Sequence, residues 1–352
     1  MRRISLIVVL LATTILTARA QEVKSIIYLI GDGMGLSSVS MMQVEGGYEP
    51  TIFDRAENIA LQKSYSMDNR VTDSAASGTA LATGCKTNNT YLGVTAEGAV
   101  LENLMEVALG EGKRTGLVVT TYLQHATPAA FYAHIPARHE YLAITDQLLA
   151  SNIDVAIGGG MAFFKERYGE ALQSVIAKSN FKLATSLDEV RNMSGKRPLL
   201  ALLADYEVGS NSGSYLADAT SEALRLLEED RDGFVLMVEG SLIDGMGHAN
   251  DAKAQQLEMQ GFMAAIEVAV EYADSHPGTL VVVTADHSTG GLSIVSADAD
   301  FTLSEQGVEY RWSTKGHSGE MIPIYLYGTG AESINGIMEN ADLGAKLKEL
   351  IR

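Results

Sequence analysis

The chain has 352 residues and a formal net charge of −18 at pH 7. A surface this acidic repels nucleic acids and anionic membranes, so we expect no nucleic-acid partner. Cys85 is the single cysteine, which excludes an intrachain disulfide, but a chain of this length can bury one large core without cross-links.

The first twenty residues have the pattern of a secretory signal peptide. Arg2 and Arg3 precede an apolar run from Ile4 to Leu16, and Ala18-Arg19-Ala20 forms an Ala-x-Ala cleavage site. The apolar run is too short to span a bilayer, and no other run is long and apolar enough. We therefore expect a signal peptide at 1–20 and an exported domain at 21–352, periplasmic or extracellular and without a membrane span.

Apolar runs rich in β-branched residues alternate with helical patterns along the chain. Strands are predicted at Ser25–Ile30, Thr115–Thr121, Ile153–Ile157, Pro198–Ala204, Gly233–Val238, Thr279–Thr284 and Ile322–Tyr327. Helices are predicted at Ser74–Gly84, Leu101–Leu109, His139–Ala150, Asp218–Glu229 and Ala252–Tyr272. This alternation predicts a single-domain α/β fold with a mostly parallel central sheet and helices on both faces. The segment Gly160–Ser214 is the least readable and is assigned to the same domain.

Ser74 lies where a predicted helix begins, between Asp73 and a run of small residues that ends near Gly78. Small neighbours would let a substrate approach the hydroxyl, and a helix N-terminus favours a bound anion. The structural alternative is an ordinary N-cap serine. Asp73 would either orient Arg138 through an ion pair or cap the helix, and Cys85 is expected in the same helix as a buried structural thiol.

Acidic residues and histidines follow four of the predicted strands. They are Asp32, His125, Thr127, Glu239, Asp286 and His287. The carboxyl ends of parallel strands meet at one edge of a sheet, and ligands bind outside that edge. We therefore predict a metal centre there.

The types and spacing of the candidate ligands indicate which metals they suit. Asp244 and His248 are four residues apart, so both can reach one ion. Mixed carboxylate and imidazole sets suit zinc in an open catalytic site. Sets that offer only oxygens, such as Asp32, Thr127 and Glu239, suit magnesium.

Such a centre would support phosphoryl chemistry at Ser74. Two metals can clamp the attacking and leaving oxygens of an in-line displacement. One of them would also lower the pKa of the Ser74 hydroxyl, so no histidine base would be required. Arg138 could donate two parallel hydrogen bonds to phosphate oxygens.

Six short blocks of the sequence resemble motifs of the alkaline phosphatase family. They are Gly31–Gly35, Thr72–Ala76, His125–Pro128, Val238–Gly240 with Asp244 and His248, Thr284–His287, and Gly316–Gly319. The blocks run in the family's order and span almost the whole chain after the signal peptide. The resemblance implies that residues 21–352 form an alkaline-phosphatase-like catalytic domain.

The resemblance also implies the role of each site residue. Ser74 would be the nucleophile, which forms a phosphoserine, and Arg138 would grip the phosphate. One zinc would be held by Asp244, His248 and His317, and the other by Asp32, Asp286, His287 and the Ser74 oxygen. A third site, usually magnesium, would involve Asp32, Thr127 and Glu239, with His125 at or beside it.

The implied activity is metal-dependent hydrolysis of small-molecule phosphate monoesters with a broad substrate range. A phosphodiesterase or phosphonate hydrolase on the same scaffold is an alternative, although such relatives usually have a threonine nucleophile and lack the third metal. A non-catalytic periplasmic phosphate- or metal-binding protein is another, but it would not need a serine among the ligands.

Three features of the sequence depart from the family pattern. His125 stands where some members carry aspartate, so magnesium should bind less tightly there. Gly245 follows Asp244, where many members carry lysine, histidine or tryptophan near the phosphate. Only 29 residues separate His287 from His317, where larger members insert a dimer-forming crown, so both a monomer and a dimer remain open.

Overall fold

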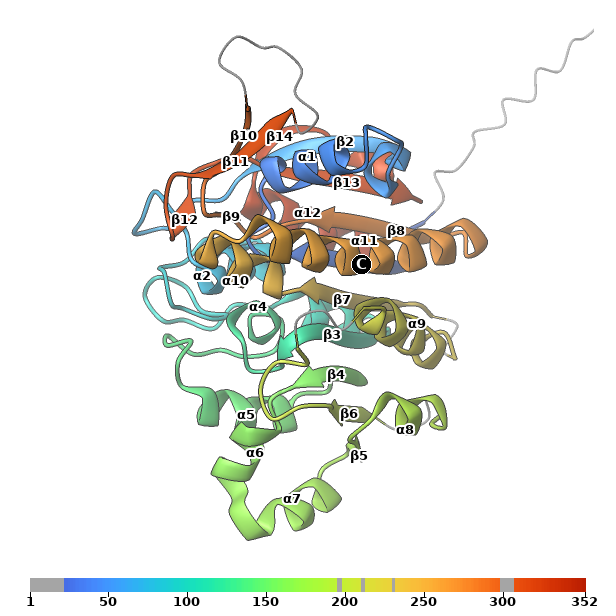
Figure 1. Ribbon diagram of the computed structural model, residues 1–352. Coiled ribbons are helices and arrows are strands. Elements are labelled where there is room, and N and C mark those ends of the chain that lie inside the picture. Colours follow the sequence, from blue (N-terminus) through green and yellow to red (C-terminus); the bar gives the residue numbers. More distant parts are fainter. Residues whose placement is uncertain (1–21, 195–197, 210–212, 230–231, 298–306) are drawn as a thin grey trace, which may run out of the picture.

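The computed structural model describes residues 22–194, 198–209, 213–229, 232–297 and 307–352 (Figure 1). The predicted signal peptide at 1–20 lies outside these ranges. Within them, every helix is too short or too polar to cross a membrane.

A ten-stranded sheet forms the centre of the molecule, in the order β14-β2-β13-β8-β1-β7-β3-β4-β6-β5. Its strands are β1 (Ser25–Gly31), β2 (Asn58–Lys63), β3 (Arg114–Tyr122), β4 (Val155–Gly159), β5 (Lys182–Ala184), β6 (Leu199–Leu202), β7 (Phe234–Gly240), β8 (Thr279–Thr284), β13 (Ile322–Gly328) and β14 (Gly336–Glu339). Neighbouring strands pair in parallel, except that β13 runs antiparallel to both β2 and β8. Two small antiparallel ribbons pair β9 (Ser288–Thr289) with β12 (His317–Ser318), and β10 (Leu292–Ser296) with β11 (Val308–Trp312).

Helices cover both faces of this sheet. They are α1 (Leu36–Glu45), α2 (Ser74–Thr83), α3 (Leu104–Gly110), α4 (Ala126–Ala129), α5 (Tyr141–Ala150), α6 (Met161–Tyr168), α7 (Leu172–Lys178), α8 (Leu187–Arg191), α9 (Tyr215–Leu227), α10 (Leu242–Ala249), α11 (Ala252–Ser275) and α12 (Asn340–Ile351), with short 3-10 turns at Ile52–Arg55, Gly169–Ala171 and Ala331–Ser333. Side chains of β1 alternate between two cores, because successive residues of a strand point to opposite faces. Ile26 and Tyr28 pack with α2, α3, α5 and α12, whereas Ile27 and Leu29 pack with α1, α9 and α11, which lie in front of the sheet in Figure 1.

The predicted fold class is confirmed, and all seven predicted strands are present, with ends that shift by no more than two residues. The structure adds β2, β5, β14, the two ribbons and several helices. Residues 160–214 contribute β5 and β6, which extend the main sheet at one end.

The prediction for Cys85 is wrong. Helix α2 ends at Thr83, and Gly84 caps it in the left-handed conformation with a φ of 77°. The chain therefore leaves the helix before Cys85, whose side chain is exposed.

Candidate functional site

Four adjacent parallel strands, β8, β1, β7 and β3, deliver the predicted polar residues to one edge of the sheet. Asp32 follows β1, Glu239 is the penultimate residue of β7, and Asp286 lies just beyond β8. His125 follows β3 and immediately precedes α4. The predicted convergence at the carboxyl ends of these strands is therefore confirmed.

Helix α2 carries Ser74 to this edge. Asp73 has an extended backbone, and its Oδ1 accepts a hydrogen bond of 2.9 Å from the backbone N–H of Ala76, so it is the N-cap. Ser74 is the first helical residue, where backbone N–H groups have no partner within the helix. Its hydroxyl lies 3.2 Å from Nε2 of His287.

Asp73 also forms an ion pair with Arg138, so this carboxylate has both predicted roles: it caps α2 and it orients the arginine. Its Oδ2 accepts a hydrogen bond from Nη1 of Arg138 at 3.1 Å, and another from the backbone N–H of Thr90 at 3.0 Å. The second terminal nitrogen of Arg138 lies 3.4 Å from Nε2 of His125. The guanidinium is thus held at the N-cap of α2, between Asp73 and His125.

The carboxylates at the centre of the site are completely buried, yet most of their oxygens have no hydrogen-bond partner among the described residues. The unpartnered ligand atoms are Oδ1 and Oδ2 of Asp32, Oε1 and Oε2 of Glu239, Oδ2 of Asp286, Oγ1 of Thr127 and Nδ1 of His125. The hydroxyls of Thr127 and Ser241 face Glu239 without a well-formed hydrogen bond. Buried polar atoms normally find partners, so these atoms fit a site for cations.

The electrostatics of this cluster support the same conclusion. Burial, with nearby carboxylates adding to it, raises the pKa of Glu239 to about 8 and that of Asp286 to about 7. Burial and the charges of Asp286 and Asp244 raise the pKa of Asp32 well above its usual range. Without a cation, Glu239 would therefore be mostly protonated and Asp286 partly protonated at neutral pH.

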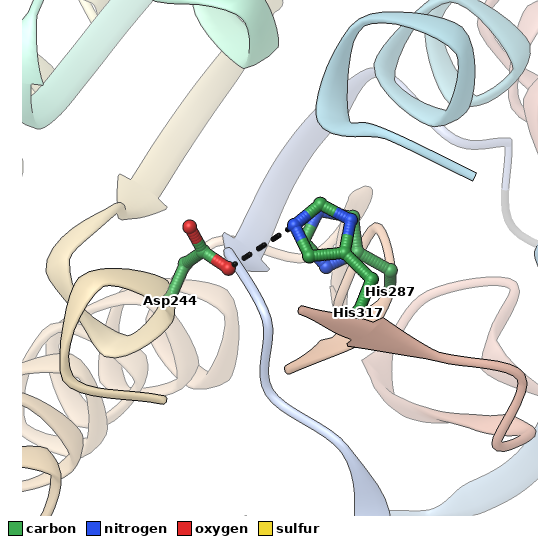
Figure 2. Close-up of side chains that lie close together, drawn as sticks. All are labelled: Asp244, His287 and His317. Atoms are coloured by element: carbon green, nitrogen blue, oxygen red, sulfur yellow. Dashed lines mark ion pairs between the residues drawn. The ribbon is translucent and has the colours of Figure 1, made fainter. Parts of the chain in front are cut away.

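Three groups of candidate ligands have their ligand atoms within 4.8 Å of one another. The groups are Asp32 with His125 and Glu239, Asp32 with Asp286 and His287, and Asp244 with His287 and His317. Asp32 belongs to two groups and His287 to two, so the groups form one continuous cluster. In Figure 2, the stacked rings of His287 and His317, with centroids 3.5 Å apart, face Asp244, and Nε2 of His317 lies 3.6 Å from Oδ1 of Asp244.

The histidines are oriented through their Nδ1 atoms. Nδ1 of His317 donates to the carbonyl of Thr72 at 2.8 Å, and Nδ1 of His248 donates to the carbonyl of Lys315. A carbonyl can only accept, so each Nδ1 carries a proton, and Nε2, which faces Asp244, is the atom that could bind an ion once it is deprotonated. For His287, Nδ1 lies 3.2 Å from Oγ1 of Thr289.

His248 lies at the margin of the cluster. It is on α10 with Asp244, and its Nε2 lies 3.3 Å from Oδ2 of Asp244. This contact raises the pKa of His248 to about 9. Burial alone would raise the pKa of Asp244, but the contact with His248 and the other histidines lower it below its usual range. The group of ligand atoms that includes Asp244 contains His287 and His317. The sequence analysis predicts His248 in the place of His287.

Two residues that hold candidate ligands in place, Thr289 and Gly33, have no role assigned from the sequence. Oγ1 of Thr289 bonds both to Oδ1 of Asp244, at 2.5 Å, and to His287. The backbone N–H of Gly33 donates to Oδ1 of Asp286 at 3.1 Å, and an added Cβ at Gly33 would come within 2.9 Å of the Asp244 backbone. The glycine-rich block around Asp32 signals a close approach, but no sequence pattern links Thr289 to Asp244.

Comparisons with known proteins agree with this geometry. Residues 23–306 match the family model described as alkaline phosphatase. The chain is 32% identical to alkaline phosphatase 3 of Bacillus subtilis, with 92% of this chain and 87% of that protein covered. It is 30% identical to the alkaline phosphatase of Escherichia coli, with 92% and 85% covered.

Solved structures show the same relationship. The alkaline phosphatase of the Antarctic bacterium TAB5 is 33% identical and superposes with a TM-score of 0.89, over 95% of this chain and 99% of that chain. The cold-active alkaline phosphatase of a Shewanella species is 32% identical, with a TM-score of 0.85 over 93% of this chain and 100% of that one. The chain belongs to the alkaline phosphatase family and is a metal-dependent phosphomonoesterase.

Proposed function

We propose that the protein hydrolyses small phosphate monoesters in two steps, with Ser74 first taking the phosphoryl group and then releasing it to water. One observation carries this proposal: the Ser74 hydroxyl lies 3.2 Å from His287, at the rim of a cluster of buried ligand atoms that lack partners. A nucleophilic serine needs an activating group beside it. A metal ion held by the cluster would be that activating group.

The residues around Ser74 support the binding of a phosphate group. The first N–H groups of α2 and the positive end of its dipole favour an anion at this point. Arg138 can donate two parallel hydrogen bonds to phosphate oxygens. Because Asp73 holds both Arg138 and the first turn of α2, the arginine and the nucleophile keep a defined separation.

The unpartnered ligand atoms support metal binding by the sets that include Asp32, and the group of Asp244, His287 and His317 supports a further ion at the other end of the cluster. Asp244, His248 and His317 would hold one zinc ion, and Asp32, Asp286 and His287 would hold the second beside Ser74. Magnesium would occupy the group of Asp32, Thr127 and Glu239, with His125 beside it. Bound ions would supply Lewis-acid charge that lowers the pKa of a hydroxyl and neutralises phosphate oxygens.

His125 makes the third site the least typical for magnesium, because imidazole is softer and uncharged. Burial and the charge of Arg138 lower its pKa to about 3, so it is a neutral ligand at physiological pH. In the TAB5 enzyme, a variant with aspartate in place of a histidine has Mg bound in its M3 site. We propose that the metal preference of the third site in this chain depends on the residue at position 125.

We also propose that residues 1–20 are a signal peptide and that the protein is exported. The residues assigned to the site would bind the phosphoryl group, which all monoesters share, so we propose a broad range of monoesters. The presence of Thr127 and Glu239 in the cluster with Asp32 also favours a monoesterase over a phosphodiesterase.

Rates on an aryl phosphate and on the matching diester, measured together with the metal content of the purified protein, test the proposal. We expect the monoester to react at least about a hundredfold faster, since the Ser74 site and Arg138 address a terminal phosphate. Faster hydrolysis of the diester would identify a phosphodiesterase. Phosphate binding without turnover of either compound would identify a binding protein.

A further inference from the structure

The C-terminal helix α12 contacts the catalytic edge through its first residue. Asn340 is completely buried, and its Nδ2 donates a hydrogen bond of 3.0 Å to Oγ of Ser77. Oγ of Ser77 donates in turn to the backbone carbonyl of Asp286 at 2.6 Å. Ser77 lies one helical turn after Ser74, so this pair of hydrogen bonds joins the nucleophile's helix to the turn that carries Asp286 and His287.

The orientation of the Asn340 amide is determined by its other partners. Its Oδ1 accepts hydrogen bonds from Nζ of Lys86 at 2.7 Å and from the backbone N–H of Ala341 at 3.0 Å. An ammonium group can only donate, so the amide oxygen must face Lys86 and the amide nitrogen must face Ser77. Lys86 is itself held by the backbone carbonyl of Tyr65 at 2.6 Å.

Helices α2 and α12 also pack in direct backbone contact. A Cβ added at Gly344 would lie 2.4 Å from the carbonyl oxygen of Ala80, and one added at Gly84 would lie 2.9 Å from Ala345. Neither helix can approach the other further. A shorter side chain at position 340 therefore leaves the hydrogen bond to Ser77 unmade.

Asp286 is restrained from several sides. Its Oδ1 accepts from the backbone N–H groups of Gly33 at 3.1 Å and His287 at 3.0 Å, and the carbonyl of Ala285 accepts from Nε2 of Gln62 at 2.8 Å. The Ser77 hydroxyl holds the backbone carbonyl of Asp286, and Oδ2 of Asp286 is the carboxylate oxygen without a hydrogen-bond partner.

We propose that Asn340 is a positioning residue that acts through Ser77 to set the separation between the Ser74 hydroxyl and the Asp286–His287 ligand pair. The inference rests on the proposed function, because it assigns Asn340 a role in the same site. It places one determinant of activity in the last helix of the chain, outside the motif blocks.

The first test compares Asn340→Ala with Lys348→Met as the control. Nζ of Lys348 also links α12 to α2, through the carbonyl of Thr83 at 3.3 Å, but at the end of α2 away from Ser74. We expect Asn340→Ala to lower kcat/KM by about tenfold to a hundredfold and to weaken zinc affinity about tenfold, measured by competition with a chromogenic chelator. Lys348→Met should lower the Tm while both quantities stay within about twofold.

The second test asks whether Asn340 acts through Ser77. We expect the double variant Ser77→Ala/Asn340→Ala to lose no more activity or zinc affinity than Ser77→Ala alone. Additive losses, or unchanged kcat/KM and zinc affinity in Asn340→Ala, would overturn the inference. If Asn340→Ala does not fold, kcat/KM and zinc affinity are measured in Asn340→Asp instead. This variant keeps an acceptor for Lys86 but removes the donor to Ser77. Absence of ester hydrolysis by the unaltered protein would instead refute the proposed function, and the zinc comparison would still test Asn340.

Discussion

Ser74 and His287 are separated by 213 residues in the chain, yet the hydroxyl of one lies 3.2 Å from Nε2 of the other. Ser74 begins α2, and His287 follows β8 at the centre of the sheet. Because Nδ1 of His287 is engaged by Thr289, Nε2 is the atom available to an ion beside the hydroxyl. This contact brings the nucleophile and the ligand cluster into one site.

Replacement of Ser74 by alanine should abolish turnover while the fold and the metals remain. The hydroxyl is the only group proposed to take the phosphoryl group, so we expect kcat to fall by about a thousandfold or more. Steady-state kinetics, zinc content and Tm of Ser74→Ala check this. Near-normal turnover in a variant that keeps its zinc would show that another group is the nucleophile.

The two roles of Asp73 can be separated by two substitutions. Asn caps helices about as well as Asp but carries no charge for Arg138. We expect Asp73→Asn to keep the cap of α2, to lower the Tm less than Asp73→Ala does because only the contacts of Oδ2 are lost, and to raise the inhibition constant of inorganic phosphate about threefold to tenfold. Asp73→Ala should do the same to phosphate binding and also lower stability by about 0.5–2 kcal/mol. Equal loss of stability in both variants would contradict the capping role.

The metal-free protein should lose stability as the pH rises. In the folded state, burial raises the pKa of Glu239 to about 8 and that of Asp286 to about 7, whereas both carboxyls have pKa values of about 4 when unfolded. Between these limits the folded state binds more protons, so its free energy of unfolding falls with rising pH. The Tm in chelator should therefore be higher at about pH 6 than at about pH 9.

Glu239→Gln provides the control for that pH dependence. It removes one titrating carboxyl with little change in shape, so the fall in Tm should become shallower. Saturation with zinc and magnesium should remove the fall, because bound cations favour the charged carboxylates. A metal-free Tm that rises between these pH values would contradict the buried, partly protonated cluster.

Substitution of His125 by aspartate should change the metal preference of the third site. Nδ1 of His125 lies 4.0 Å from both Asp32 and Glu239, and an aspartate oxygen would occupy nearly the same place with a negative charge. We expect magnesium affinity to rise about tenfold in His125→Asp and to stay unchanged in His125→Asn, measured by calorimetric titration. Equal affinities in the two variants would show that His125 lies outside the magnesium site.

Sequence reasoning succeeded where the pattern is local. The apolar strand Thr279–Thr284 has the predicted bounds, and the polar residues that follow parallel strands had to meet at one edge. It failed for β2 and β14, which lack a run of β-branched residues, and for Cys85, because a left-handed cap at Gly84 ends the helix early.

The side-chain contacts that support the site have no local signal in the sequence. Thr289 reaches Asp244 across 45 residues, and Asn340 reaches Ser77 across 263. Such contacts depend on how the helices pack around the sheet, which periodicity does not encode. The ligands could be predicted from the sequence because carboxylates and imidazoles that directly follow buried strands rarely have a purely structural role.

Mass spectrometry of the protein quenched in acid during turnover of a phosphate monoester tests the central claim most directly. The account predicts a phosphoryl group on the peptide that contains Ser74, in the metal-loaded protein and not after chelation. A phosphorylated site elsewhere, or equal labelling of Ser74 in metal-free protein, would contradict it.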